Sequence, residues 1–123
     1  MVWYPSTDDI VDTNKMILLK GHDKHPHRLR GTRQGIQSLI NRVMAAESRG
    51  LSYQTALLMK EILQMHVFDG GNHRTAYDTA ELFLTQNGIS VKDVPAPLAY
   101  EHIRAVPEKT VEEIETWIVA NML

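Results

Sequence analysis

Apolar residues recur at intervals of three and four positions along most of the chain, which is the spacing that predicts amphipathic helices. The clearest stripe consists of Ile36, Leu39, Ile40, Val43 and Met44. Stripes of this kind predict about six helices of ordinary length. The expected helices cover Thr7–Lys20, Thr32–Glu47, Gln54–Met65, Asn72–Asn87, Leu98–Ala105 and Val111–Met122. The third is apolar around much of its circumference, so we expect it to be central and buried.

Residues that favour helix ends flank these stripes. Ser6 or Thr7 can cap the first helix and Ser52 the third, because each offers a side-chain oxygen to an unpaired backbone N–H. Thr110 to Glu113 fits a capping box at the start of the last helix. Ile89 to Val91 is expected to form a short extended piece. The pattern predicts an all-α fold, a compact bundle of helices.

Composition narrows the class of protein. A chain of 123 residues fits one domain that buries a core without covalent staples. The absence of cysteine excludes disulfides and thiolate metal sites, and a net charge of −2 gives no general case for nucleic-acid binding. The first residues lack the basic start and apolar run of a signal peptide, and no apolar run is long enough to span a bilayer. We expect a cytoplasmic protein without a membrane partner.

The turn between the third and fourth expected helices contains residues that can bind a ligand or transfer a proton. Gly70 and Gly71 allow positive φ and close approach of a ligand to the backbone. Asn72 and Arg74 open the next helix, where unpaired N–H groups and a guanidinium suit a phosphate. His66 leaves the preceding helix, and an imidazole titrates near neutral pH. These parts predict phosphate binding beside proton abstraction.

This turn resembles the signature of the Fic/Doc family, His-x-Phe-x-(Asp/Glu)-(Gly/Ala)-Asn-x-Arg. The matching residues, in register, are His66, Phe68, Gly71, Asn72 and Arg74. The residues that follow, Thr75-Ala76 and a helix ending at Asn87-Gly88, look like the Doc (death-on-curing) branch, the short toxins of toxin–antitoxin pairs. The resemblance implies a Fic/Doc-like helical fold with the turn as its active site.

The resemblance implies a role for each matched position. His66 would be the general base that takes a proton from a hydroxyl of a target protein, and Phe68 would anchor the loop. The nucleotide phosphates would be held by Gly70, Gly71, Asn72, His73 and Arg74. Members of the family move AMP or the terminal phosphate from ATP with Mg²⁺. A translation elongation factor is the known target of the Doc type, and a small antitoxin is its usual partner. Whether a homo-oligomer forms stays open.

Two positions depart from the family pattern. Gly70 stands where the family has an acidic residue that helps to hold magnesium, and the nearest carboxylate is Asp69, one place earlier. His73 stands where Fic enzymes have glycine and Doc-like members lysine. Asp69 is either a metal ligand or a cap of the fourth helix, and Asn72 is either only an N-cap or both an N-cap and a phosphate ligand. Two further hypotheses therefore remain, a degenerate nucleotide-binding member of the family and a helical interaction module.

A basic segment separates the first two expected helices. Its three histidines at positions 22, 25 and 27 have no evident fourth metal ligand, so a metal site is disfavoured. In the family the corresponding region is a flap that aligns the target segment by β-strand addition. The residues expected in this role are His27, Arg28, Arg30 and Arg33. The alternative is a solvated surface loop.

Overall fold

The computed structural model describes residues 1–20 and 32–123. These residues form six α-helices and two short 3₁₀-helices, which confirms the expected all-α fold class. In chain order they are α1 (Thr7–Lys20), α2 (Arg33–Ala45), η1 (Glu47–Arg49), α3 (Leu51–Met65), α4 (Asn72–Gln86), α5 (Ala96–Ala105), η2 (Val106–Glu108) and α6 (Val111–Asn121). None of these helices is long and apolar enough to cross a membrane.

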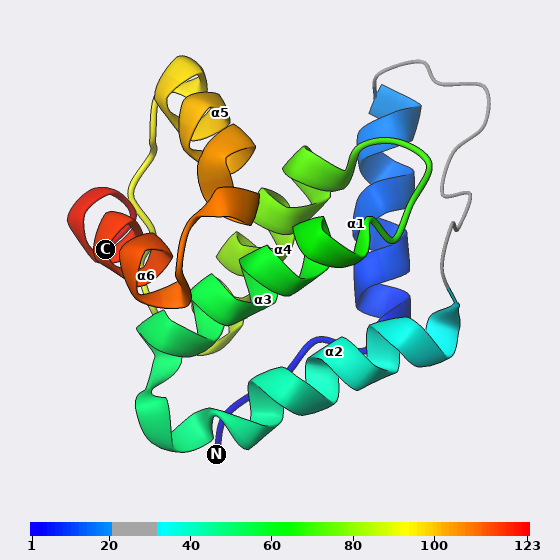
Figure 1. Ribbon diagram of the computed structural model, residues 1–123, viewed down its shortest axis with the longest axis horizontal. Helices are drawn as coiled ribbons and strands as arrows, with labels where there is room; N and C mark the ends of the chain where they lie inside the picture. Colours follow the sequence, from blue (N-terminus) through cyan, green and yellow to red (C-terminus); the bar gives the residue numbers. More distant parts are fainter. Residues whose placement is uncertain (21–31) are drawn as a thin grey trace.

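Helix α3 lies at the centre of the bundle, as its apolar pattern predicts. It packs against α2, α4 and α6, while α4 packs in turn against α1 and α5. Figure 1 shows α3 crossing the middle of the molecule among these neighbours. Its side chains Leu58, Met59 and Ile62 are fully buried, and each contributes roughly 1.5–3 kcal/mol by leaving water. The turn that follows α3 therefore starts from the core of the fold.

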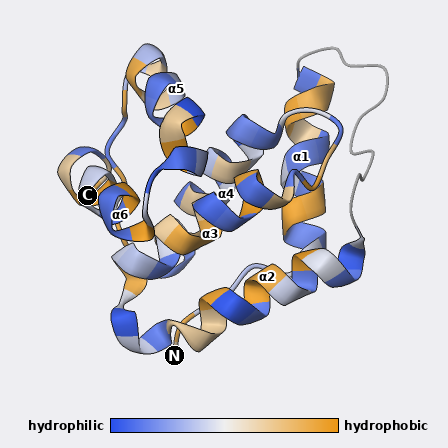
Figure 2. Ribbon diagram, viewed as in Figure 1, coloured by the Kyte–Doolittle hydropathy of each residue, from blue (hydrophilic) through white to orange (hydrophobic). Residues whose placement is uncertain are grey.

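Helix α2 is amphipathic, and hydrophobic and hydrophilic residues alternate along it in Figure 2. Four of the five residues of its predicted stripe are buried, namely Ile36, Leu39, Ile40 and Val43. The fifth, Met44, is 45% exposed, so the expectation that the whole apolar stripe is buried is wrong at this position. The helix also ends at Ala45, before the predicted Glu47, because the chain tightens there into η1.

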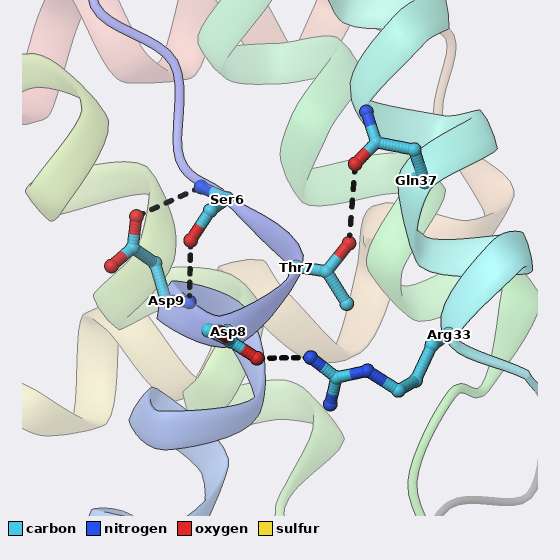
Figure 3. A network of polar contacts seen from close by, with 6 residues as sticks. All are labelled: Ser6, Thr7, Asp8, Asp9, Arg33 and Gln37. Atoms are coloured by element: carbon cyan, nitrogen blue, oxygen red, sulfur yellow. Dashed lines mark hydrogen bonds and ion pairs between the residues drawn. The ribbon is translucent and has the colours of Figure 1, made fainter.

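Reciprocal hydrogen bonds cap the start of α1. The Ser6 hydroxyl accepts from the backbone N–H of Asp9 at 3.1 Å, and the Asp9 carboxylate accepts from the N–H of Ser6 at 2.8 Å (Figure 3). The predicted cap at Ser6 is confirmed. Beside it an ion pair joins Asp8 to Arg33 at the start of α2, so the two helices are tied at this end.

Two other expected helix ends differ in outcome. The capping box of α6 is confirmed, because Thr110 and Glu113 bond reciprocally through side chain and backbone. The predicted cap at Ser52 is wrong: α3 begins one residue earlier, after Gly50, and the Ser52 hydroxyl donates to Glu115 on α6 at 2.6 Å. A tertiary partner has displaced the local capping bond.

No strand forms in the piece after α4 that was expected to be extended. Residues 89–91 belong to no strand, and the backbone N–H of Ile89 donates to Leu84 O at 3.0 Å, which closes the end of α4. Further along the chain, the backbone N–H of Lys92 donates to Met122 O at 2.8 Å. The segment therefore serves as an irregular connection that is fastened to α4 and to the end of α6.

His102 of α5 is a buried histidine held by stacking. Its ring lies 3.7 Å from the indole of Trp117, centroid to centroid, with an interplanar angle of 4°. Nδ1 lies 3.5 Å from Nζ of Lys109, and Nε2 has no hydrogen-bond partner among the described residues. Burial, followed by the positive charge of Lys109, lowers the pKa of His102 to about 4. The ring is therefore neutral in the folded protein.

This neutral ring predicts a loss of stability in acid. A histidine in the unfolded chain has a pKa near 6.5, so below that pH protons bind the unfolded state first. The stabilising contribution of the neutral ring is complete above about pH 6.5 and is lost as the pH falls toward 4, by roughly 3 kcal/mol. Urea unfolding of wild type and His102→Gln at pH 7 and pH 4.5 should show a steeper loss in wild type. Equal losses would contradict this account.

Candidate functional site

The turn between α3 and α4 begins with a strained residue. His66 caps the C-terminus of α3 in the left-handed conformation, with φ 47° and ψ 56°. Among residues 1–20 and 32–123 it is the one non-glycine residue with positive φ. This conformation costs an L-residue roughly 1–2 kcal/mol, so the surrounding structure must hold it. The side chain of His66 is exposed.

Asn72 fixes the middle of the turn. It is the first residue of α4 and only 4% exposed. Its Oδ1 accepts from the backbone N–H of Phe68 at 3.0 Å, and its Nδ2 donates to Phe68 O at 2.7 Å. The ring of Phe68 is fully buried, as expected of a loop anchor. Asn72 thus satisfies both polar backbone groups of the residue that anchors the loop.

The interpretation of Asn72 as an N-cap is wrong. The N-cap position of α4 belongs to Gly71, and no side chain caps that position. Asp69 lies on the loop before this position and is exposed, and its role as a cap of α4 stays a prediction. The N-cap preference of asparagine describes isolated helix ends, whereas here the carboxamide is turned back to the preceding loop.

Asn14 of α1 holds the turn from the buried side. It is fully buried, and its Nδ2 donates to Gly70 O at 2.8 Å and to the hydroxyl of Thr75 at 3.0 Å. Its Oδ1 has no hydrogen-bond partner among the described residues. Only the Nδ2 group of this buried carboxamide is therefore paired. Sequence analysis missed this residue as part of the site. The available signal was a polar residue on the otherwise apolar face formed with Ile10 and Leu18.

Gly71 fits tightly against Asn14. Its φ is 73°, and a Cβ added to it would lie 3.1 Å from Asn14 Nδ2 and 3.2 Å from Cδ2 of Leu18. Both the backbone conformation and the space therefore require glycine. Gly70 is less constrained, because its nearest neighbour to an added Cβ is Leu18 at 3.9 Å.

The outer side of the turn carries the groups that can meet a ligand. His66, Asp69, His73 and Arg74 are all exposed. The first intrahelical bond of α4 runs from the N–H of Thr75 to Gly71 O at 2.9 Å, so the N–H groups of residues 72–74 precede the helical ladder. Nε of Arg74 lies 3.9 Å from Oδ2 of Asp78, and the two side chains are 65% and 40% exposed, respectively. Such a pair is worth about 0–1 kcal/mol and leaves the guanidinium free to bind an anion.

Two hollows flank the start of α4. One, of about 470 Å³, lies between α4 and α5, and the other, of about 440 Å³, lies between α1 and α4. Arg74 and Asp78 line both, and His73 lines the first. Neither of these two hollows is lined by His66. The structure therefore brings His73 and Arg74 to a common hollow and leaves His66 on the loop beside it.

Of the four residues of the basic segment that are expected to contact a target, the structure describes only Arg33. Arg33 lies in the first turn of α2, where it pairs with Asp8 of α1, so its charge is partly compensated. His27, Arg28 and Arg30 lie outside the described residues. The described part of the chain also contains no group of three or more histidine and acidic residues that could hold a metal ion.

Comparison with known proteins assigns no family to this chain. No protein-family model matches the chain, and no curated protein matches it. The case for a function therefore rests on the residues of the turn and their geometry.

The tight fit of Gly71 gives a matched pair of substitutions. Gly88 also has positive φ, 81°, but a Cβ there would meet nothing within 4 Å. Gly88→Ala should cost only the left-handed backbone term of about 1–2 kcal/mol. Gly71→Ala should cost about 1–3 kcal/mol more, because the methyl group also displaces Asn14 and Leu18. Urea unfolding measures both values, and an equal cost would contradict the tight fit described here.

Proposed function

We propose that this protein is a Doc-like member of the Fic/Doc family, a transferase that moves a phosphoryl or AMP group from ATP to a hydroxyl of a target protein. The observation that supports it best is the division of the turn into two sides. Asn14 and Asn72 hold its backbone from the inside, while His66 and Arg74 are exposed on the outside. A fixed backbone with outward functional groups is what positioning catalysis requires.

In this proposal the nucleotide phosphates bind at the N-terminus of α4. The N–H groups of residues 72–74 lie before the helical ladder, and Arg74 supplies charged donors beside them. The carboxamide of Asn72 contributes by holding Phe68, so its phosphate contact is through the backbone N–H. Gly70, Gly71 and His73 complete the rim of the site.

His66 acts as the general base. The target hydroxyl oxygen attacks phosphorus, its proton passes to the imidazole, and the bond to the leaving ADP or pyrophosphate breaks. His66 does not line the hollows that Arg74 lines, so the target approaches from the loop side while the nucleotide lies toward α4. His66 has a left-handed backbone and is exposed, so its ring is open to such a contact.

Magnesium fits this site only together with the nucleotide. Gly70 offers no carboxylate, and Asp69 is the nearest acidic residue. A phosphate-bound Mg²⁺ keeps several waters and needs one or two carboxylates. The ligands in this proposal are therefore phosphate oxygens, waters and at most Asp69, and the ion would neutralise phosphate charge during transfer.

A second candidate function is nucleotide binding without turnover. Gly70 in place of an acid and the separation of His66 from the hollows favour it. It retains the phosphate contacts of Arg74 and the start of α4 but transfers nothing.

The proposed partners follow from the resemblance. A cytoplasmic protein, with a translation elongation factor as the first choice, is the proposed substrate. A small antitoxin that covers the site is the proposed inhibitor. His27, Arg28, Arg30 and Arg33 are the residues proposed to contact the substrate.

Transfer of labelled phosphate tests the proposal. The protein is incubated with purified elongation factor or cell lysate, Mg²⁺, and ATP labelled at either the α or the γ position. We expect one of the two labels to reach a protein. His66→Asn should lower the rate about 10²–10⁴-fold, because the base is lost while asparagine tolerates the left-handed backbone. Arg74→Ala should also lower it.

The control for Arg74 is Arg49→Ala. Arg49 is similarly exposed and its ion pair with Glu112, at 3.7 Å, resembles that of Arg74 with Asp78 at 3.9 Å. It should leave the rate unchanged. If ATP raises the melting temperature but neither label moves, the binding function replaces the transferase. If ATP neither binds nor reacts, both functions are wrong.

A further inference from the structure

The hollow between α4 and α5 has the size and walls of a small-molecule pocket. Its volume of about 470 Å³ lies within the range of about 300–1,000 Å³ that is typical of such sites. Figure 1 shows α5 and α1 on different sides of α4, and residues of α5 line this pocket whereas residues of α1 line the other hollow. One wall is apolar and includes Ala99 and Ile103 of α5.

The opposite wall, on α4, carries negative charge. Asp78 and Glu81 are three residues apart, so they share one face of the helix, and both line the pocket. Both are only partly exposed. Asp78 has Arg74 at 3.9 Å, whereas Glu81 has no ion pair among the described residues. The acidic wall is therefore only partly compensated by positive charge.

The pKa shifts agree with this deficit of positive charge. Burial raises the pKa of Glu81, and the negative charges of Asp78 and Asp93 raise it further. Burial also raises the pKa of Asp78, although Arg74 and Lys20 oppose the effect. A cation placed between the two carboxylates would relieve this repulsion.

Aromatic rings complete the pocket. Tyr77 lines it beside the acids, and burial together with the charges of Glu81, Asp78 and Asp93 raises its pKa to about 12, so its phenol stays neutral. Tyr100 at the rim already has the guanidinium carbon of Arg104 5.6 Å from its ring centroid. Ring faces of this kind attract cations, and more strongly where water is excluded.

We propose that this pocket binds a small organic ammonium ion, with its charged head between Asp78 and Glu81 and its apolar body against Ala99 and Ile103. An anion would meet the carboxylates, and a neutral apolar molecule would bury them without compensation. The carboxylates of Asp78 and Glu81 lie further along α4 than the phosphate site and have the opposite charge, although His73 and Arg74 border both sites. It does not depend on the proposed transferase activity.

Phenethylammonium chloride and 2-phenylethanol are the matched probes, because they share a body and differ in the charged head. Titration of the ¹⁵N-labelled protein, followed by amide chemical shifts, should show saturable changes in residues 77–81 and 99–103 with the ammonium ion. We expect a Kd of roughly 1 mM or lower, and binding of the alcohol at least about tenfold weaker. Added salt should weaken the binding of the ammonium ion.

Glu81→Gln is the decisive variant, since it removes the charge and keeps the shape. It should weaken binding of the ammonium ion about tenfold or more. Glu108→Gln, an equal change of charge at an exposed residue of η2 outside the pocket, should not. Nα-acetyl-lysine amide as a third probe separates a free amine from a protein side chain as the source of the ammonium group. Equal binding of ion and alcohol, equal binding by wild type and Glu81→Gln, or no saturable shift would overturn the proposal.

Discussion

Two buried carboxamides hold the turn on which the rest of the structure depends. Asn72 bonds both backbone groups of Phe68, and Asn14 reaches across from α1 to Gly70 O. Each bond adds only about 0.5–1.5 kcal/mol net, but leaving its buried partner unpaired costs about 1–3 kcal/mol. The turn therefore stays closed because opening it strands several polar groups at once. This constraint maintains the left-handed backbone at His66 and Gly71.

The same constraint determines which side chains of the turn are buried and which are exposed. Residues that fasten the turn point inward and are buried, whereas His66, His73 and Arg74 remain outside. A fixed arrangement of this kind lowers the entropic cost of aligning reactants. Along α4 the character then changes, from N–H groups and a guanidinium at its start to two carboxylates one turn later. The two proposals therefore place an anion and a cation on different stretches of the same helix.

Local pattern was enough to predict the helices, because each buries an apolar stripe against α3 or α4 and that periodicity is visible in the sequence. The pattern did not predict the role of a side chain whose hydrogen-bond partner lies far away in the sequence. Ser52 was expected to cap α3 but bonds Glu115, and Asn14 acts on a carbonyl 56 residues away. The orientation of the Asn72 carboxamide likewise depends on the buried loop it meets. The pocket beside Glu81 exists only because α5 folds back onto α4, which spacing does not reveal.

Amide hydrogen exchange at Phe68 tests the closed turn most directly. The N–H of this residue donates to the side chain of Asn72 and not to a helix carbonyl, so its protection reports on that carboxamide. If the two carboxamides hold the turn as described, this N–H exchanges with protection close to that of the buried amides of α3, through global unfolding. If it exchanges as fast as the amides of exposed loop residues, the turn opens on its own and the central claim is contradicted.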